Sequence, residues 1–226
     1  MAQPSEWCSM PGDDAPLGER DGAWWTRTHT PELNADSIEH AFVAEKLRVH
    51  VPSARGITVQ RVQNRLLEQS YTQFRDRKVK PFNEGDANER FLFHGTGAVA
   101  PTEVLAGRDG LDPRFSDGSG FYGQGIYLAE SAAYPIGGRY AHRVAGHSGG
   151  RMQLLVVRAA VGLPQELGTT VNGTTRAMRM PGPRPDGERY DSVRAGPHRP
   201  FLSGPGDGGD GDDASVVYVI YRSEQM

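Results

Sequence analysis

The chain has 226 residues, with 25 Lys and Arg against 28 Asp and Glu, which gives a formal net charge of −3. This balance excludes a strongly basic protein held on nucleic acid mainly by phosphate neutralisation, so charge does not indicate a nucleic-acid partner. The 29 glycines and 16 prolines make up about one-fifth of the chain, below the quarter or more that is typical of disorder. The composition therefore predicts a folded protein with many loops.

The single cysteine, Cys8, excludes an internal disulfide and a zinc site built on cysteines. No apolar run approaches the roughly 20 residues that span a membrane. The first 20 residues also lack the basic-then-apolar pattern of a signal peptide. We therefore expect an intracellular protein, in the nucleus or the cytoplasm, with no membrane partner.

The first 35 residues are rich in Pro, Gly and acidic residues and show no hydrophobic period, although they contain Trp7, Trp24 and Trp25. They predict a disordered or loosely docked tail over 1–35, followed by one folded domain over 36–226. At the start of that domain Asp36 and Glu39 have the spacing of a capping box.

Two helices and a short strand are predicted next. The first helix follows Asp36, and four apolar residues define its buried face: Ile38, Phe42, Val43 and Leu47. Alternation of Ile57 and Val59 predicts a short strand. A second helix is expected over 62–78, where apolar residues again recur at helical spacing.

Apolar runs predict four strands in the rest of the chain, at 91–94, 125–129, 154–161 and 216–221. The run at 154–161 is uninterrupted, which predicts a strand buried on both faces. A glycine-rich loop is expected at 107–123, and helical residues from 131 to 144 are interrupted by Pro135 and two glycines. Residues 162–214 are expected to be irregular. Helices early and strands late favour an α+β fold.

Gly118, Gly120 and Gly123 match G-x-G-x-x-G, but the dinucleotide fingerprint needs a strand before it and a helix after it. A strand-like segment follows here, so we reject a Rossmann site. Four aspartates lie among glycines near the end of the chain: Asp207, Asp210, Asp212 and Asp213. Their spacing does not fit a calcium-binding loop of 12 residues, and a flexible acidic insertion is the better interpretation.

The histidines show no spacing typical of metal ligands. We expect His142, His147 and His198 to face solvent from polar loops. His94 differs, because it ends an apolar strand and precedes Gly95, which permits close approach of a ligand to the backbone.

The segments around His94 occur with others in a definite order. They are ITVQRVQN at 57–64, GDANERFLFHGT at 85–96, FYGQGIYLAE at 121–130, SAAYPIGGRY at 131–140, RMQLLVVRAAVG at 151–162 and RYDSV at 189–193. This series resembles the catalytic domain of the poly(ADP-ribose) polymerase family, the diphtheria-toxin-like ADP-ribosyltransferases. It is most similar to the mono-ADP-ribosylating branch, and the resemblance covers about residues 38–226.

The resemblance implies an ADP-ribosyltransferase fold of the α+β class, with two packed, mostly antiparallel sheets, flanking helices and a cleft for NAD. NAD would be a consumed substrate, no metal would be required, and the partner would be an acceptor protein or the chain itself. The implied activity is transfer of single ADP-ribose units to protein side chains with release of nicotinamide.

The resemblance also implies roles for individual residues. His94 corresponds to the histidine that bonds the adenosine ribose, and Gly95 to the glycine whose backbone pairs with the nicotinamide carboxamide. Thr96 occupies the next, usually hydroxylated, position. Tyr127 would pack against nicotinamide as the second member of the catalytic set with His94, and Tyr140 would stack on the same ring.

Arg114, in the variable loop at 108–122, would meet a phosphate of NAD. Two departures from the family pattern are apparent. Pro135 occupies the place of a serine that bonds the carboxamide, and the third member of the catalytic set would lie beyond Met226, as in a C-terminally truncated domain. An inactive module that binds NAD, ADP-ribose or a protein partner is therefore the second hypothesis beside the transferase.

Overall fold

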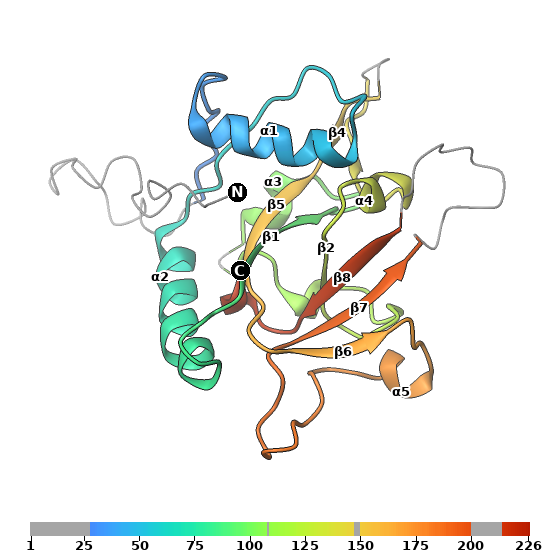
Figure 1. Ribbon diagram of the computed structural model, residues 1–226. Coiled ribbons are helices and arrows are strands. Elements are labelled where there is room, and N and C mark those ends of the chain that lie inside the picture. Colours follow the sequence, from blue (N-terminus) through green and yellow to red (C-terminus); the bar gives the residue numbers. More distant parts are fainter. Residues whose placement is uncertain (1–27, 108, 147–149, 200–213) are drawn as a thin grey trace, which may run out of the picture. The chain divides into compact units, whose positions relative to one another are not determined.

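The computed structural model describes residues 28–107, 109–146, 150–199 and 214–226 (Figure 1). The tryptophans and Cys8 of the predicted tail, His147 and the acidic insertion at 207–213 lie outside the described residues. No helix in the described ranges is both long enough and apolar enough to cross a membrane.

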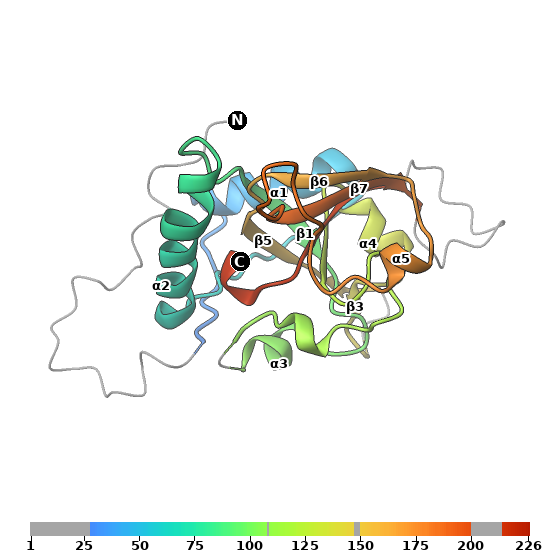
Figure 2. The same ribbon diagram turned by 90° about the horizontal axis from the view of Figure 1, so that it is seen from below.

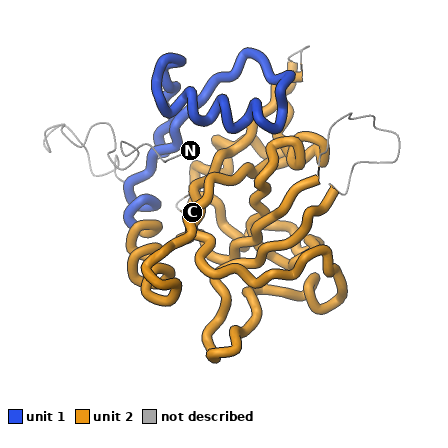
Figure 3. The backbone as a smooth tube through the Cα atoms, viewed as in Figure 1, with its two compact units in different colours: residues 1–69 blue, residues 70–226 orange. Residues whose placement is uncertain are grey.

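The chain divides into two compact units, residues 1–69 and 70–226 (Figure 3). The first contains α1 (Ile38–His50), whose N-cap is Ser37 and not Asp36, because the Ser37 hydroxyl accepts a hydrogen bond from the His40 N–H at 3.2 Å. The predicted buried face is wrong at Ile38, which is 61% exposed. The short strand predicted at Ile57 and Val59 is also wrong.

Isolated bridges hold that part of the first unit instead of a strand, pairing His29 with Gln63 and Glu32 with Gln60. An ion pair between Arg61 and Glu39 ties the same segment to α1. These bridges and the ion pair give the backbone groups and the charged side chains their partners without a regular strand. Two alternating apolar residues were therefore insufficient to specify a strand.

The second unit is organised around a six-stranded sheet of order β5-β1-β2-β8-β7-β6 (Figure 1). Its strands are β1 (Glu89–His94), β2 (Ile126–Ala129), β5 (Leu155–Ala160), β6 (Pro164–Gly168), β7 (Ser192–His198) and β8 (Ser215–Ile220). Neighbouring strands are antiparallel except β6 and β7. A second, two-stranded sheet pairs β3 (His142–Arg143) with β4 (Met152–Gln153). The predicted α+β fold with mostly antiparallel sheets is confirmed.

The helices are short apart from α1 and α2 (Arg65–Phe74), which continues through a π turn at Arg75–Val79 and a 3-10 turn at Lys80–Phe82. The others are α3 (Pro101–Leu105), α4 (Ala133–Gly137) and α5 (Gly173–Arg176). The break predicted in the 131–144 region is confirmed, since α4 ends at Gly137. In both views α5 lies beside the end of β6 (Figures 1 and 2).

The central strands carry the core of the second unit. Leu92, Leu128, Val161 and Ile220 are almost completely buried in one cluster. The prediction that 154–161 is buried on both faces holds only for its second half, where Ala159, Ala160 and Val161 are 0% exposed, whereas the first residues of the edge strand β5 are only partly buried. The stretch predicted to be irregular, 162–214, contains β6, α5 and β7. Its low apolar content hid these elements.

Replacing Leu128 with Ala tests this core. Leu128 is 0% exposed in the short strand β2, so truncation leaves a cavity in the cluster that it shares with Leu92 and Ile220. We expect the free energy of unfolding to fall by about 2–5 kcal/mol in urea denaturation. Met180→Ala is the control at a half-exposed site and should change it by no more than about 0.5 kcal/mol. Equal effects of the two substitutions would contradict this account of the core.

Candidate functional site

His94 and Tyr127 lie where β1 and β2 diverge. The two strands share the register pair Phe93 and Ala129, and continuing that register would place Gly95 opposite Tyr127. Instead, the imidazole Nδ1 of His94 lies 2.8 Å from the Tyr127 carbonyl oxygen. A carbonyl can only accept, so Nδ1 carries the proton, and Nε2 of the neutral ring is left as an acceptor.

The surroundings of His94 favour this neutral form. Burial lowers the pKa of His94 below its ordinary value of 6.5, against the weaker opposite effect of the hydrogen bond to Tyr127. At neutral pH the ring therefore presents Nε2 as an acceptor suited to a hydroxyl group.

Beyond His94 the chain leaves β2 and approaches the segment that contains Tyr140. The Gly97 N–H donates to the Tyr140 carbonyl at 2.6 Å. A Cβ added at Gly95 would lie 2.3 Å from that carbonyl oxygen, so a side chain at this position would force the two backbones apart. The close approach explains the glycine after His94. The Thr96 hydroxyl donates to the Val99 carbonyl at 2.6 Å and closes the turn that follows.

The backbone at Tyr140 is held from its other side by α4. Both the Tyr140 and Ala141 N–H groups donate to the Pro135 carbonyl at 2.9 Å. The ring of Tyr140 lies 5.9 Å from that of Tyr134, at an interplanar angle of 33°. Pro135 thus has a structural role through its carbonyl, although it lacks the hydroxyl of the serine expected at its position.

The phenol of Tyr127 is fixed by the glycine-rich loop. Its hydroxyl accepts from the Tyr122 N–H at 2.8 Å and donates to the Gly123 carbonyl at 3.0 Å. Burial raises the pKa of Tyr127 to about 12, so the phenol stays neutral. A Cβ at Gly120 would lie 2.3 Å from the Tyr127 hydroxyl, which explains why the loop carries glycine there.

His198 is the main residue that sequence reasoning misplaced. It was expected to face solvent, but it ends β7 and its Nε2 lies 2.5 Å from the hydroxyl of Tyr122, which is completely buried. Tyr221 donates to the carbonyl of the same Tyr122 at 2.7 Å. The Gly-Pro pair before His198 is typical of a loop and concealed this position. Through Tyr122, both residues support the loop that holds Tyr127.

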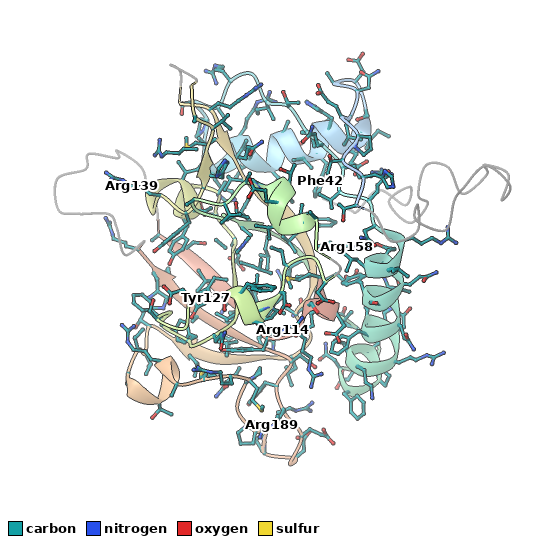
Figure 4. The ribbon with its side chains drawn as sticks, turned by 180° about the vertical axis from the view of Figure 1, so that it is seen from behind. Phe42, Arg114, Tyr127, Arg139, Arg158 and Arg189 are labelled. Atoms are coloured by element: carbon teal, nitrogen blue, oxygen red, sulfur yellow. The ribbon has the colours of Figure 1, made fainter. Side chains whose placement is uncertain are left out.

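Arg114 is not brought into contact with the other predicted site residues by any described hydrogen bond or ion pair. Its side chain is 74% exposed and pairs with Asp109 and Asp112 of its own loop (Figure 4). The guanidinium holds the pKa of Asp112 below its usual range. The guanidinium thus faces two carboxylates of its own loop, and the phosphate contact of Arg114 stays a prediction.

His94, Gly95, Thr96, Tyr127 and Tyr140 thus lie on adjoining segments, with His94 bonded to Tyr127 and the 95–97 turn bonded to Tyr140. The ring of Tyr127 and the acceptor nitrogen of His94 can position a ligand, whereas neither offers a carboxylate. Within the described ranges, no group of three or more His, Cys, Asp or Glu is arranged to hold a metal ion.

This combination of fold and motif order defines an ADP-ribosyltransferase domain. A family model described as the Poly(ADP-ribose) polymerase catalytic domain matches residues 34–179, which is more than half of the chain. The chain belongs to this family of transferases, which use NAD as substrate. The match contains the six candidate site residues, which are His94, Gly95, Thr96, Arg114, Tyr127 and Tyr140, and it ends before β7 and β8.

Two glycine substitutions test how the loop holds Tyr127. Gly120→Ala places a methyl group against the Tyr127 hydroxyl, and we expect it to lower the free energy of unfolding by about 1–3 kcal/mol. It should also speed amide exchange of Tyr122, whose N–H donates to that hydroxyl. Gly118→Ala is the matched control, since its Cβ would meet nothing within 4 Å. Unchanged Tyr122 exchange in the Gly120 variant would contradict the contact.

Proposed function

We propose that this domain transfers single ADP-ribose units from NAD to protein side chains and releases nicotinamide. The observation that carries the proposal is the junction of β1 and β2, where a neutral His94 with a free acceptor nitrogen is bonded to the backbone of Tyr127. His94 would accept a hydrogen bond from the adenosine ribose, and the backbone of Gly95 would pair with the carboxamide.

The reaction breaks the bond between ribose and nicotinamide, and positive charge develops on the ribose. A rigid site favours departure of nicotinamide by holding it in one orientation. Tyr127 suits this task, because its hydroxyl has one donor and one acceptor within the loop and its ring is left to pack on a ligand. With a raised pKa, the phenol contributes through its ring and not through proton transfer.

Transfer of single units follows from the resemblance to the mono-ADP-ribosylating branch. Elongation of a chain requires a carboxylate that polarises an acceptor hydroxyl. Neither His94 nor Tyr127 supplies one. The acceptor would be a partner protein or the chain itself, in the nucleus or the cytoplasm.

A second candidate is a module that binds NAD or ADP-ribose without turnover, and Pro135 favours it. Proline has no hydroxyl to donate to the carboxamide, so one orienting hydrogen bond is missing, worth about 0.5–1.5 kcal/mol. Such a loss corresponds to a roughly twofold to tenfold weaker affinity for NAD. The two candidates differ in whether label from NAD is transferred.

The experiment that tests the proposal measures nicotinamide release and label transfer from labelled NAD. We expect both in the parent protein and neither in His94→Ala, because the variant loses the acceptor for the ribose and the tie to Tyr127. His50→Ala, at the end of α1, is the control and should retain the parent rate.

A pH profile sharpens the same experiment. Because the pKa of His94 is lowered, the ring stays neutral as the pH falls to 6.5, and NAD affinity should decline only below that value.

A folded parent protein that binds NAD without turnover would favour the second candidate. A parent that neither binds nor turns over NAD would contradict both.

Pro135→Ser tests the missing hydroxyl directly. Restoring a donor should raise NAD affinity by roughly twofold to tenfold, as measured by calorimetry. The Pro135 carbonyl, which holds the Tyr140 and Ala141 N–H groups, is retained in the variant. An NAD analogue without the carboxamide serves as the control, because it should show no gain. An equal gain with both ligands would place the effect elsewhere.

A further inference from the structure

A cavity of about 600 Å³ opens beside the segment that holds Tyr140. Two parts of the chain form it, the turn after β1 and the residues between α4 and the end of β3. Its lining residues are Gly97, Ala98, Arg139, Ala141, His142 and Arg143. All of them belong to the second compact unit, and Arg139 follows α4 (Figure 4). No role assigned above uses this cavity.

The walls of the cavity are fixed by hydrogen bonds. The Gly97 N–H donates to the Tyr140 carbonyl at 2.6 Å, and Nδ1 of His142 lies 3.1 Å from the Gly97 carbonyl oxygen. Since that carbonyl accepts, Nδ1 of His142 carries the proton. The backbone pairing of β3 with β4 anchors His142 and Arg143 on the other side. The cavity is therefore formed by the backbone before any ligand binds.

Its charge is of one sign. Two arginines line the cavity, and none of its lining residues is a carboxylate. The sequence from Ser131 to Gln165 contains four arginines and no Asp or Glu, in a chain whose net charge is −3. Arg139 and Arg143 are both exposed residues. This local excess of positive charge points to an anion.

The backbone at Arg139 supports the same conclusion. Its φ is 57°, in the left-handed region that glycine adopts readily and other residues rarely do. Gly137 and Gly138 directly precede it, yet the residue in the unfavourable conformation is an arginine. Unfavourable backbone conformations cluster at ligand sites, where the side chain is needed in one place.

We propose that this cavity binds a small phosphate-bearing ligand of up to nucleotide size. Arginine matches phosphate oxygens with two parallel hydrogen bonds, and two arginines line this one cavity. The volume lies within the range of small-molecule sites. The ligand contacts neither His94 nor Tyr127 in this arrangement, so the site stands independently of the proposed transferase activity.

The cavity nonetheless shares one element with the candidate NAD site. Gly97 lines the cavity, and its N–H donates to the carbonyl of Tyr140, whose neighbours Arg139 and Ala141 also line it. A ligand in the cavity would therefore lie beside the hydrogen bond between Gly97 and Tyr140, which also holds Gly95 and Tyr140 in place in the candidate NAD site.

Calorimetric titration of the parent protein with AMP, pyrophosphate and citrate at about 0.15 M ionic strength tests the proposal. We expect AMP and pyrophosphate to bind more tightly than citrate. Arg143→Gln should weaken binding about tenfold or more, because charge-assisted hydrogen bonds are lost. Arg151→Gln is the matched control. Arg151 directly precedes β4 and does not line the cavity, so the variant loses the same charge at a different place. It should change the affinity less than about twofold.

The pattern across ligands identifies what is bound. Tighter binding of AMP than of pyrophosphate means that the cavity also holds a nucleoside, whereas equal affinities mean that phosphate alone is recognised. No binding of either ligand at millimolar concentration would overturn the proposal, as would equal losses in the Arg143 and Arg151 variants. Binding of AMP that Arg143→Gln leaves unchanged would also overturn it, by placing the ligand outside this cavity.

Discussion

The hydrogen bond from His94 to the carbonyl of Tyr127 determines how the rest of the site is arranged. At this point β1 stops pairing with β2, and a side chain replaces the backbone donor that Gly95 would have supplied. The end of β1 is thereby released to pair with the Tyr140 segment. A continuous ladder would satisfy the same carbonyl but would leave no divergence between the strands. The cost of an unpaired buried carbonyl makes the histidine necessary once the strands separate.

Close backbone approaches then limit which residues can surround the site. Gly95 is required because the Tyr140 carbonyl lies where its Cβ would be, and Gly120 because the Tyr127 hydroxyl does. Gly95 belongs to the segment HGT, which contains His94, and Gly120 directly precedes the segment FYGQG, which leads into Tyr127. Spacing therefore identifies them as a motif, while the physical reason for each is visible only when the segments are brought together.

The sequence predicted the strands that consist of consecutive apolar residues. The strands β1, β2, β5 and β8 were found in this way, and His94 was found because it ends one of them. β6 and β7 were missed, since their pairing depends on backbone register and on few apolar side chains, such as Val193. His198 was missed for the same reason, and no local pattern shows that it meets Tyr122 across 76 residues. The family resemblance supplied the roles of residues, which periodicity alone does not provide.

The hydrogen bonds around Tyr127 limit which role its side chain can have in the candidate site. Its hydroxyl is saturated by one donor and one acceptor of the loop, and its raised pKa keeps it neutral. The loop is held in turn by Tyr122, which contacts His198 and Tyr221. A phenol fixed from this many directions cannot move to exchange a proton without breaking the loop. The assembly is therefore built for holding a ring in place, and a reaction whose barrier is lowered by orientation of the leaving group is the one that such rigidity serves.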